Sequence, residues 1–93
     1  MRTIERTTQF RRDYKREARG HYRATLDLHL VELFGLLIAD AELPDRYVDH
    51  GLGGRWSGYR DCHVHPDLVL IYRKPGAETL QLVRLGSHSE LSL

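Results

Sequence analysis

The sequence predicts an α+β domain in which two N-terminal helices pack on one face of a mostly antiparallel four-stranded sheet, in the order β-α-α-β-β-β. Three observations lead to this fold. Apolar residues recur every four positions in the N-terminal half, a glycine-containing segment follows, and apolar runs separated by short turns occupy the C-terminal half. The 93 residues suffice for one hydrophobic core, so residues 1–93 are expected to form a single domain.

Both helices are predicted from the spacing of their apolar residues. After a short expected edge strand at 2–6, apolar side chains recur at Phe10, Tyr14 and Ala18. This spacing predicts an amphipathic helix over about 8–19, which Gly20 ends. A broader apolar stripe predicts a second helix over about 22–39. Its residues are Leu26, Leu30, Leu33, Phe34 and Leu37.

The remaining strands are predicted in the C-terminal half. Residues 41–54 contain Pro44 and a group of glycines without a clear period, so a loop is expected there. Strands are then predicted over residues 55–65, 68–73 and 80–83. The dipeptide Pro66-Asp67 is a tight-turn signal, so the first two of these strands should form a hairpin.

Composition and charge narrow the class of protein. A single cysteine, Cys62, excludes an internal disulfide, and the N-terminus has no apolar leader segment. A cytoplasmic protein is therefore expected. No apolar run approaches the roughly 20 residues of a membrane span, so no membrane partner is expected. The net charge is only +1, but basic residues crowd the first 19 positions and form either a solvated helix face or a phosphate-contacting patch.

Polar residues of the C-terminal half are candidates for an acid–base site. In an antiparallel meander the last strand returns toward the turn at 63–67, which brings His88 close to His63 and Asp67, and His50 can join them. Histidine titrates near pH 6.5, so a pair can serve as base and acid at neutral pH. An arginine such as Arg84 would stabilise charge on a phosphoryl oxygen. Cleavage of an RNA phosphodiester by its own 2′-hydroxyl needs this combination and no metal.

A metal site is the competing interpretation. His63 and His65 form a His-x-His pair, and strand alternation would place both on one face. With Asp67 and His88 they would supply nitrogen and oxygen ligands suited to zinc. Taken singly, His21 and His29 are expected to be surface or structurally satisfied side chains. The same is expected of His65, because it lies in a turn beside Pro66 where nothing is expected to pair with it.

The chain resembles the YafQ branch of the RelE/ParE toxin superfamily in the segments YVDHGLGGRWSGYRDCHVHPDLVLIYR and LVRLGSHSEL. FRRDYKR is similar to the start of the first helix in that family. The resemblance implies a RelE-like fold and a ribosome-dependent endoribonuclease that cuts mRNA in the A site. It also implies a DinJ-like antitoxin that neutralises the toxin, contact with operator DNA only through the antitoxin complex, and no cofactor.

The same resemblance assigns roles to individual residues. The family's catalytic residues correspond to His50, His63, Asp67 and His88. The implied chemistry is metal-free transesterification that leaves a 2′,3′-cyclic phosphate and a 5′-hydroxyl. His88 is expected to be the general acid, and the general base stays open among the other three. Arg84 is expected to steady the scissile phosphate, and Arg60 to contact RNA or the ribosome.

Two positions depart from the family pattern. Ser92 stands where the family carries a phenylalanine, and a hydroxymethyl group cannot stack on a base. His65 stands where the family often has glutamate. A weakened or non-catalytic member that mainly binds its antitoxin is therefore an alternative. There are two further alternatives. One is a ParE-like toxin acting on gyrase, although that branch lacks this set of histidines. The other is a metal-dependent hydrolase.

Overall fold

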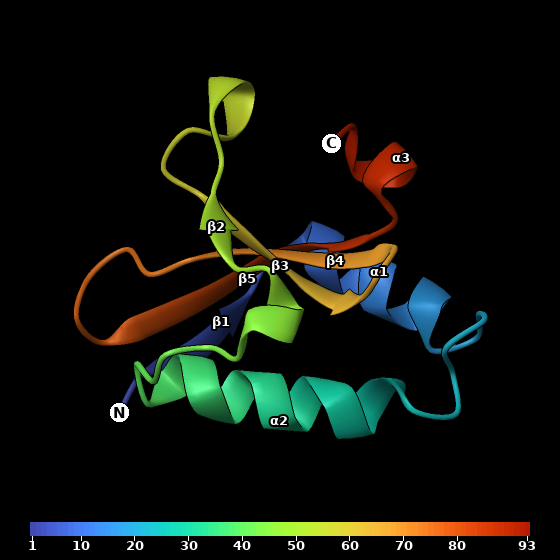
Figure 1. Cartoon of the computed structure of the whole chain (residues 1–93), viewed down its shortest axis with the longest axis horizontal. Helices are drawn as coiled ribbons and strands as arrows, with labels where there is room; N and C mark the ends of the chain where they lie inside the picture. Colours follow the sequence, from blue (N-terminus) through green and yellow to red (C-terminus); the bar gives the residue numbers. More distant parts are fainter.

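The computed structural model describes residues 1–93 and has the predicted α+β architecture with one strand more than expected (Figure 1). Five strands form one sheet in the order β1-β5-β4-β3-β2. They are β1 (Thr3–Arg6), β2 (His50–Gly51), β3 (Arg60–His65), β4 (Leu68–Arg73) and β5 (Thr79–Gly86). β1 runs parallel to β5, and all other neighbours are antiparallel. The additional strand is β2, which lies in the segment where only a loop was expected.

Two long helices and one short helix complete the fold. They are α1 (Thr8–Glu17), α2 (Leu26–Ile38) and α3 (His88–Leu91). Thr7 begins α1, because its side-chain oxygen accepts a hydrogen bond from the backbone N–H of Phe10 at 3.0 Å. Both long helices are shorter than predicted, and a turn over residues 18–25 joins them. None of the helices combines the length and hydrophobicity that a membrane crossing requires.

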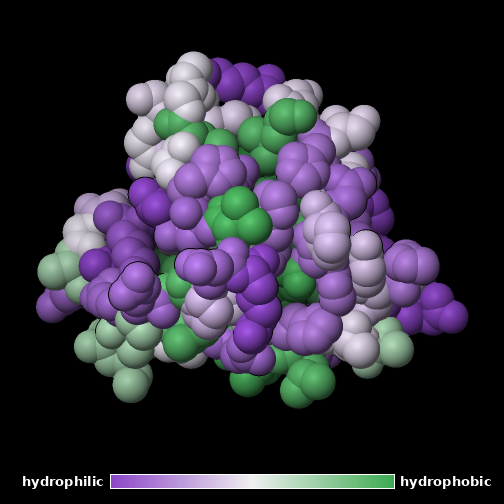
Figure 2. Space-filling view, viewed as in Figure 1, coloured by the Kyte–Doolittle hydropathy of each residue, from purple (hydrophilic) through white to green (hydrophobic).

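Apolar residues are buried on both faces of the sheet. Side chains alternate along β4, so Leu68 and Leu70 face α1 and α2, whereas Val69 and Ile71 face the other way. The helix-covered face holds the larger core. The opposite face holds a smaller cluster closed by Leu91 of α3. On the side seen in Figure 2, hydrophilic residues separate small apolar patches.

The strand predicted over 55–65 begins later, at Arg60. A 3₁₀ turn, η2 (Gly54–Trp56), occupies the expected start. Gly58 then has a φ of 89°, a conformation that glycine adopts more readily than other residues. A second 3₁₀ turn, η1 (Asp45–Tyr47), precedes β2. The last strand is longer than predicted and leads directly into α3.

A β-bulge separates the two histidines of the His-x-His pair. His63 is paired with Val69, but His65 is paired with Leu68, so the register shifts between them. Val69 and Leu68 lie on opposite faces of the sheet. The expectation that His63 and His65 share a face is therefore wrong, because the extra residue of the bulge reverses the alternation.

His65 is held by residues of the helical layer. Its ring stacks on Tyr22 with the centroids 4.0 Å apart and the planes 10° from parallel. Its Nε2 lies 3.1 Å from Nδ1 of His29 in α2. Burial, together with the nearby His29 and His21, lowers the pKa of His65. The expectation that nothing pairs with His65 is wrong.

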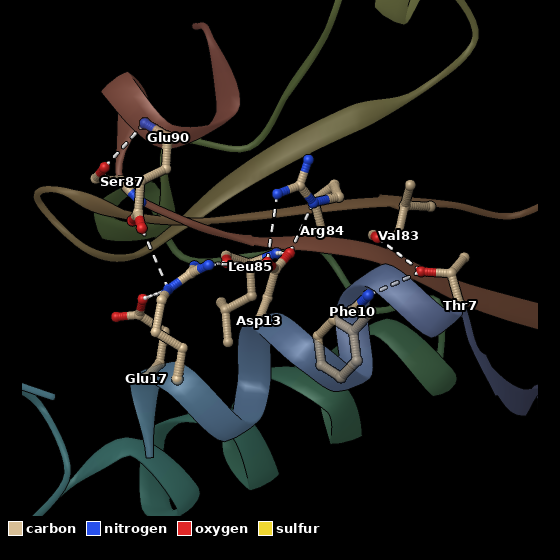
Figure 3. A network of polar contacts seen from close by, with 10 residues as sticks. Thr7, Phe10, Asp13, Glu17, Val83, Arg84, Leu85, Ser87 and Glu90 are labelled. Carbon is tan, nitrogen blue, oxygen red and sulfur yellow. Dashed lines mark hydrogen bonds and ion pairs between the residues drawn. The ribbon is translucent and has the colours of Figure 1, made fainter. Parts of the chain in front are cut away.

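β4 pairs with β5 up to Gly86 on one side. On the other side, α1 replaces a neighbouring strand along the final residues of β5. β1 pairs with β5 only as far as Leu82. Beyond this point Thr7 Oγ1 donates a hydrogen bond to the carbonyl of Val83 at 2.8 Å, and Arg16 Nη2 donates to the carbonyl of Leu85 at 2.8 Å (Figure 3). Side chains of α1 thus satisfy backbone groups that an edge strand would leave open.

Asp13 is the buried centre of this contact, with 2% of its surface exposed. Its Oδ2 accepts from the backbone N–H of Leu85 at 3.0 Å and from Nε of Arg84 at 2.7 Å. Its Oδ1 accepts from Nη1 of Arg16 at 3.0 Å. One carboxylate on α1 therefore fixes the backbone of β5 and two cations (Figure 3).

We predict that Asp13→Asn destabilises the fold, because an amide cannot balance the two guanidinium groups and cannot accept all of these bonds. Removing one partner of a buried ion pair typically costs about 3 kcal/mol or more in the free energy of unfolding. Urea denaturation followed by circular dichroism measures the change. Asp45→Asn, an exposed acid in η1, is the matched control. Equal stability of the two variants would contradict the assignment.

We also predict that His65 makes the fold less stable in mild acid. The unfolded chain takes up a proton near the ordinary histidine pKa of about 6.5. Folded His65 takes one up only at lower pH, so stability falls as the pH drops from 6.5 through the lowered pKa. His65→Phe keeps a ring for stacking on Tyr22 and should lose less stability between pH 7 and pH 5.

Denaturation midpoints at several pH values measure this effect. The exposed His21→Gln serves as the control and should keep most of the acid sensitivity of the parent. Parallel pH profiles for the parent and His65→Phe would show that His65 does not carry the effect.

Candidate active site

Asp67 and His88 form a direct pair where the β3–β4 turn meets α3. Nδ1 of His88 lies 2.7 Å from Oδ1 of Asp67, and the backbone N–H of His88 donates to the same oxygen at 3.0 Å. The hydrogen bonds from the side chain and the backbone of His88 lower the pKa of the Asp67 carboxyl. Because Asp67 engages Nδ1, the Nε2 of His88 is the nitrogen that faces a substrate.

His63 stands beside this pair, on β3. Its ring is edge-on to that of His88, with centroids 5.0 Å apart and an interplanar angle of 77°. The antiparallel connection thus brings His63, Asp67 and His88 together, as the sequence predicted. His63 can share this site only because the bulge follows it, so that His65 turns to the other face while His63 does not.

His50 joins the cluster from β2, where it is paired with Asp61 of β3. Its Nδ1 lies 2.9 Å from the carbonyl oxygen of Val48 and 3.1 Å from Oδ1 of Asp61. A carbonyl oxygen only accepts, so Nδ1 carries a proton that points at Val48. Oδ1 of Asp61 is close to His50 but has no hydrogen-bond partner.

Asp61 is a functional candidate that the sequence reasoning missed. The residue is 3% exposed, and burial raises the pKa of its carboxyl. Attraction to His50, His63 and His88 acts against this rise in the pKa of Asp61. The sequence did contain a sign of this role: Asp61 lies two residues before His63, so both residues face the same side of a strand.

The two arginines expected at the substrate are bound to carboxylates. Nε and Nη2 of Arg84 bind Asp13, and no hydrogen bond involves its Nη1. Nη2 of Arg60 lies 2.9 Å from Oδ2 of Asp49. Arg60 also lines a surface cavity of about 570 Å³, whose other cations are Arg73 and Lys74.

The zinc interpretation depended on His63 and His65 facing one ion. The bulge places them on opposite faces, so these two side chains do not converge. No group of three or more histidine, cysteine or acidic side chains has an arrangement that would hold a metal ion. What the side chains do form is a set of imidazoles beside carboxylates, groups that can donate and accept protons.

Comparison with known proteins places this chain in a family. The family described as "Bacterial toxin of type II toxin-antitoxin system, YafQ" matches residues 2–93. The mRNA interferase toxin YafQ of Escherichia coli K12 is 38% identical over 91 residues, which cover 98% of this chain and 96% of that protein.

Solved structures agree over the whole fold. The crystal structure of YafQ from E. coli BL21(DE3) has a TM-score of 0.82 at 39% identity and covers 98% of each chain. YafQ in the E. coli DinJ–YafQ complex has a TM-score of 0.78 at 37% identity, with 98% of each chain covered. A metal-bound toxin from Helicobacter pylori has a TM-score of 0.80 at 39% identity, covering 98% of this chain and 99% of that one. The chain therefore belongs to the YafQ family of bacterial toxins of type II toxin–antitoxin systems.

Proposed function

We propose that this toxin is a ribosome-dependent mRNA interferase, an endoribonuclease that cleaves mRNA in the ribosomal A site. The observation that carries the proposal is the Asp67–His88 pair with His63 edge-on beside it. This pair presents an imidazole nitrogen, oriented by a carboxylate, to the outside of the fold. The E. coli relative is itself named an mRNA interferase toxin.

The proposed chemistry is transesterification without a metal. A base removes the proton of the ribose 2′-hydroxyl, whose oxygen attacks the adjacent phosphorus. The bond from phosphorus to the 5′-oxygen breaks, and Nε2 of His88 gives that oxygen a proton. The products are a 2′,3′-cyclic phosphate and a 5′-hydroxyl. Asp67 keeps the His88 ring in place and stabilises its charged form.

The general base is one of His50, His63 and Asp67. Oδ1 of Asp67 already accepts two hydrogen bonds from His88, which favours the histidines. The Asp61 carboxylate lies beside His50 and would stabilise the positive charge that this ring gains on taking up a proton. These contacts favour His50 as the base.

Basic residues supply the binding of RNA and the ribosome. Arg60, Arg73 and Lys74 line one cavity on the surface together with the acids Glu42, Asp45 and Asp49. Of these cations, Arg60 is proposed to contact RNA or the ribosome. Arg84 is proposed to steady the scissile phosphate through its free Nη1. No cofactor takes part, and action on translating ribosomes implies a cytoplasmic protein.

A DinJ-like antitoxin is the proposed protein partner. The E. coli structure is a DinJ–YafQ complex, and this chain matches its toxin over 98% of each chain. Operator DNA is then contacted only indirectly, through the toxin–antitoxin complex.

A weakened toxin that mainly binds its antitoxin is the second candidate. Ser92 follows the last residue of α3, and its side chain offers no aromatic ring at this position. Base stacking typically contributes about 1–3 kcal/mol per base, which this chain would forgo there.

We predict that Ala at His50, His63, Asp67 or His88 relieves growth arrest when the toxin is expressed. Loss of a general acid or base typically lowers a rate by about 10²–10⁴-fold. Primer extension on cellular mRNA, with and without translating ribosomes, measures cleavage, and circular dichroism checks the fold. His21→Ala, an exposed histidine outside the site, should remain toxic. Full toxicity of all four site variants would refute the site assignment.

Antitoxin binding and cleavage in a metal chelator separate the alternative functions. A parent chain that binds antitoxin but neither arrests growth nor cleaves mRNA would support the weakened toxin. Phenanthroline chelates transition metals and leaves the magnesium that ribosomes need. Cleavage should persist in its presence, and its loss would favour a metal-dependent hydrolase.

A further inference from the structure

We propose that the ion pair between Arg16 of α1 and Glu90 of α3 positions His88 for RNA cleavage. This inference rests on the function proposed above. Arg16 and Glu90 touch no reacting atom in it, so both are positioning residues. The pair links the end of the sheet to the short helix that begins with His88 (Figure 3).

Arg16 contacts both segments that lead to His88. Its Nη2 donates to the carbonyl of Leu85, near the end of β5, at 2.8 Å. Its Nε lies 3.2 Å from Oε2 of Glu90 in α3 and 2.9 Å from Oε2 of Glu17 in α1. One guanidinium group thus spans the junction between β5 and α3.

Glu90 uses its two oxygens for different partners. Oε1 accepts from the backbone N–H of Ser87 at 3.0 Å, while Oγ of Ser87 accepts from the backbone N–H of Glu90 at 3.1 Å. This reciprocal pair is a capping box, and it begins the helix at the residue before His88. Oε2 remains for Arg16. The carboxylate therefore joins the cap of α3 to α1.

Gly86 shows how closely these groups approach. A Cβ atom at this position would lie 3.0 Å from Nη2 of Arg16 and 3.3 Å from Oε1 of Glu90. Any larger residue here would require the Arg16 and Glu90 side chains to shift. Gly86 is the last residue of β5, directly before Ser87. The ion pair thus closes over the point where the chain turns from strand to helix.

The short helix needs such external contacts. α3 has only four residues, and an isolated helix of this length is unstable. Leu91 is buried and anchors its far end. At its beginning, the orientation of His88 depends on the cap, the bonds to Asp67 and the link to Arg16.

Stability and catalysis should respond differently to loss of the pair. Both side chains are about two-fifths exposed, at 42% and 41%, and pairs of this kind contribute little to stability. A small misplacement of a catalytic group, in contrast, can lower a rate by roughly tenfold or more. A purely structural role would change the denaturation midpoint and leave the rate of the folded protein intact.

Glu90→Gln is the test variant, because glutamine can keep the capping box while the charge facing Arg16 is removed. Glu17→Gln is the matched control, since it removes the other carboxylate bound to the same Nε. We expect Glu90→Gln to lower kcat for mRNA cleavage on programmed ribosomes roughly tenfold with KM unchanged. Glu17→Gln should keep the parental kcat, and both should keep the parental denaturation midpoint.

An NMR titration of the Asp67 carboxyl gives a second readout that needs no activity. The parent has a lowered Asp67 pKa because His88 bonds to it. If Glu90 positions His88, the Asp67 pKa rises toward its ordinary value in Glu90→Gln and stays lowered in Glu17→Gln. In a parent that does not cleave RNA, this rise supports the link although the proposed function fails. A parental Asp67 pKa in Glu90→Gln, or a parental kcat in an active toxin, overturns the proposal.

Discussion

The carboxylate of Asp13 is the contact on which the site-bearing end of the sheet depends. β1 is too short to accompany β5 beyond Leu82, and a buried strand edge without partners would be costly. Asp13 and its neighbours on α1 supply those partners from side chains. Burying the carboxylate is itself unfavourable, and hydrogen bonds from three residues offset this cost. Since β5 runs through Gly86 into α3, the position of α1 determines where His88 lies.

The candidate site lies on the side of the sheet that has the smaller apolar cluster. The larger apolar cluster holds the sheet against α1 and α2, and the smaller cluster supports α3 on the opposite face. His50, His63 and His88 come from three different elements on or beside this side. Polar contacts hold two of them, Val48 for His50 and Asp67 for His88, and His63 packs edge-on against the His88 ring. A rigid layer thus presents functional groups on short, exposed segments, where a substrate can reach them.

The sequence predicted what depends on local period and connectivity. Apolar spacing indicated both helices, and the hairpin with its returning strand brought His63, Asp67 and His88 together. It did not predict the bulge before His65, because one extra residue leaves no mark in the alternation of a short strand. β2 has two residues, too few for any period. The pairing of Arg84 with Asp13 joins positions 71 residues apart, and no pattern along the chain connects them.

The two buried or bound carboxylates give the histidines unequal surroundings. Asp67 accepts two bonds from His88, which lowers its pKa and keeps it charged beside that ring. Asp61 is buried with an oxygen that lacks a donor, and its pKa is raised. His50 thus stands beside a buried carboxylate oxygen that lacks a donor, whereas His88 stands beside a carboxylate to which it already donates. Imidazoles beside different carboxylates can take different parts in proton transfer. This asymmetry of contacts is the structural argument behind the proposed roles of His88 as the acid and His50 as the base.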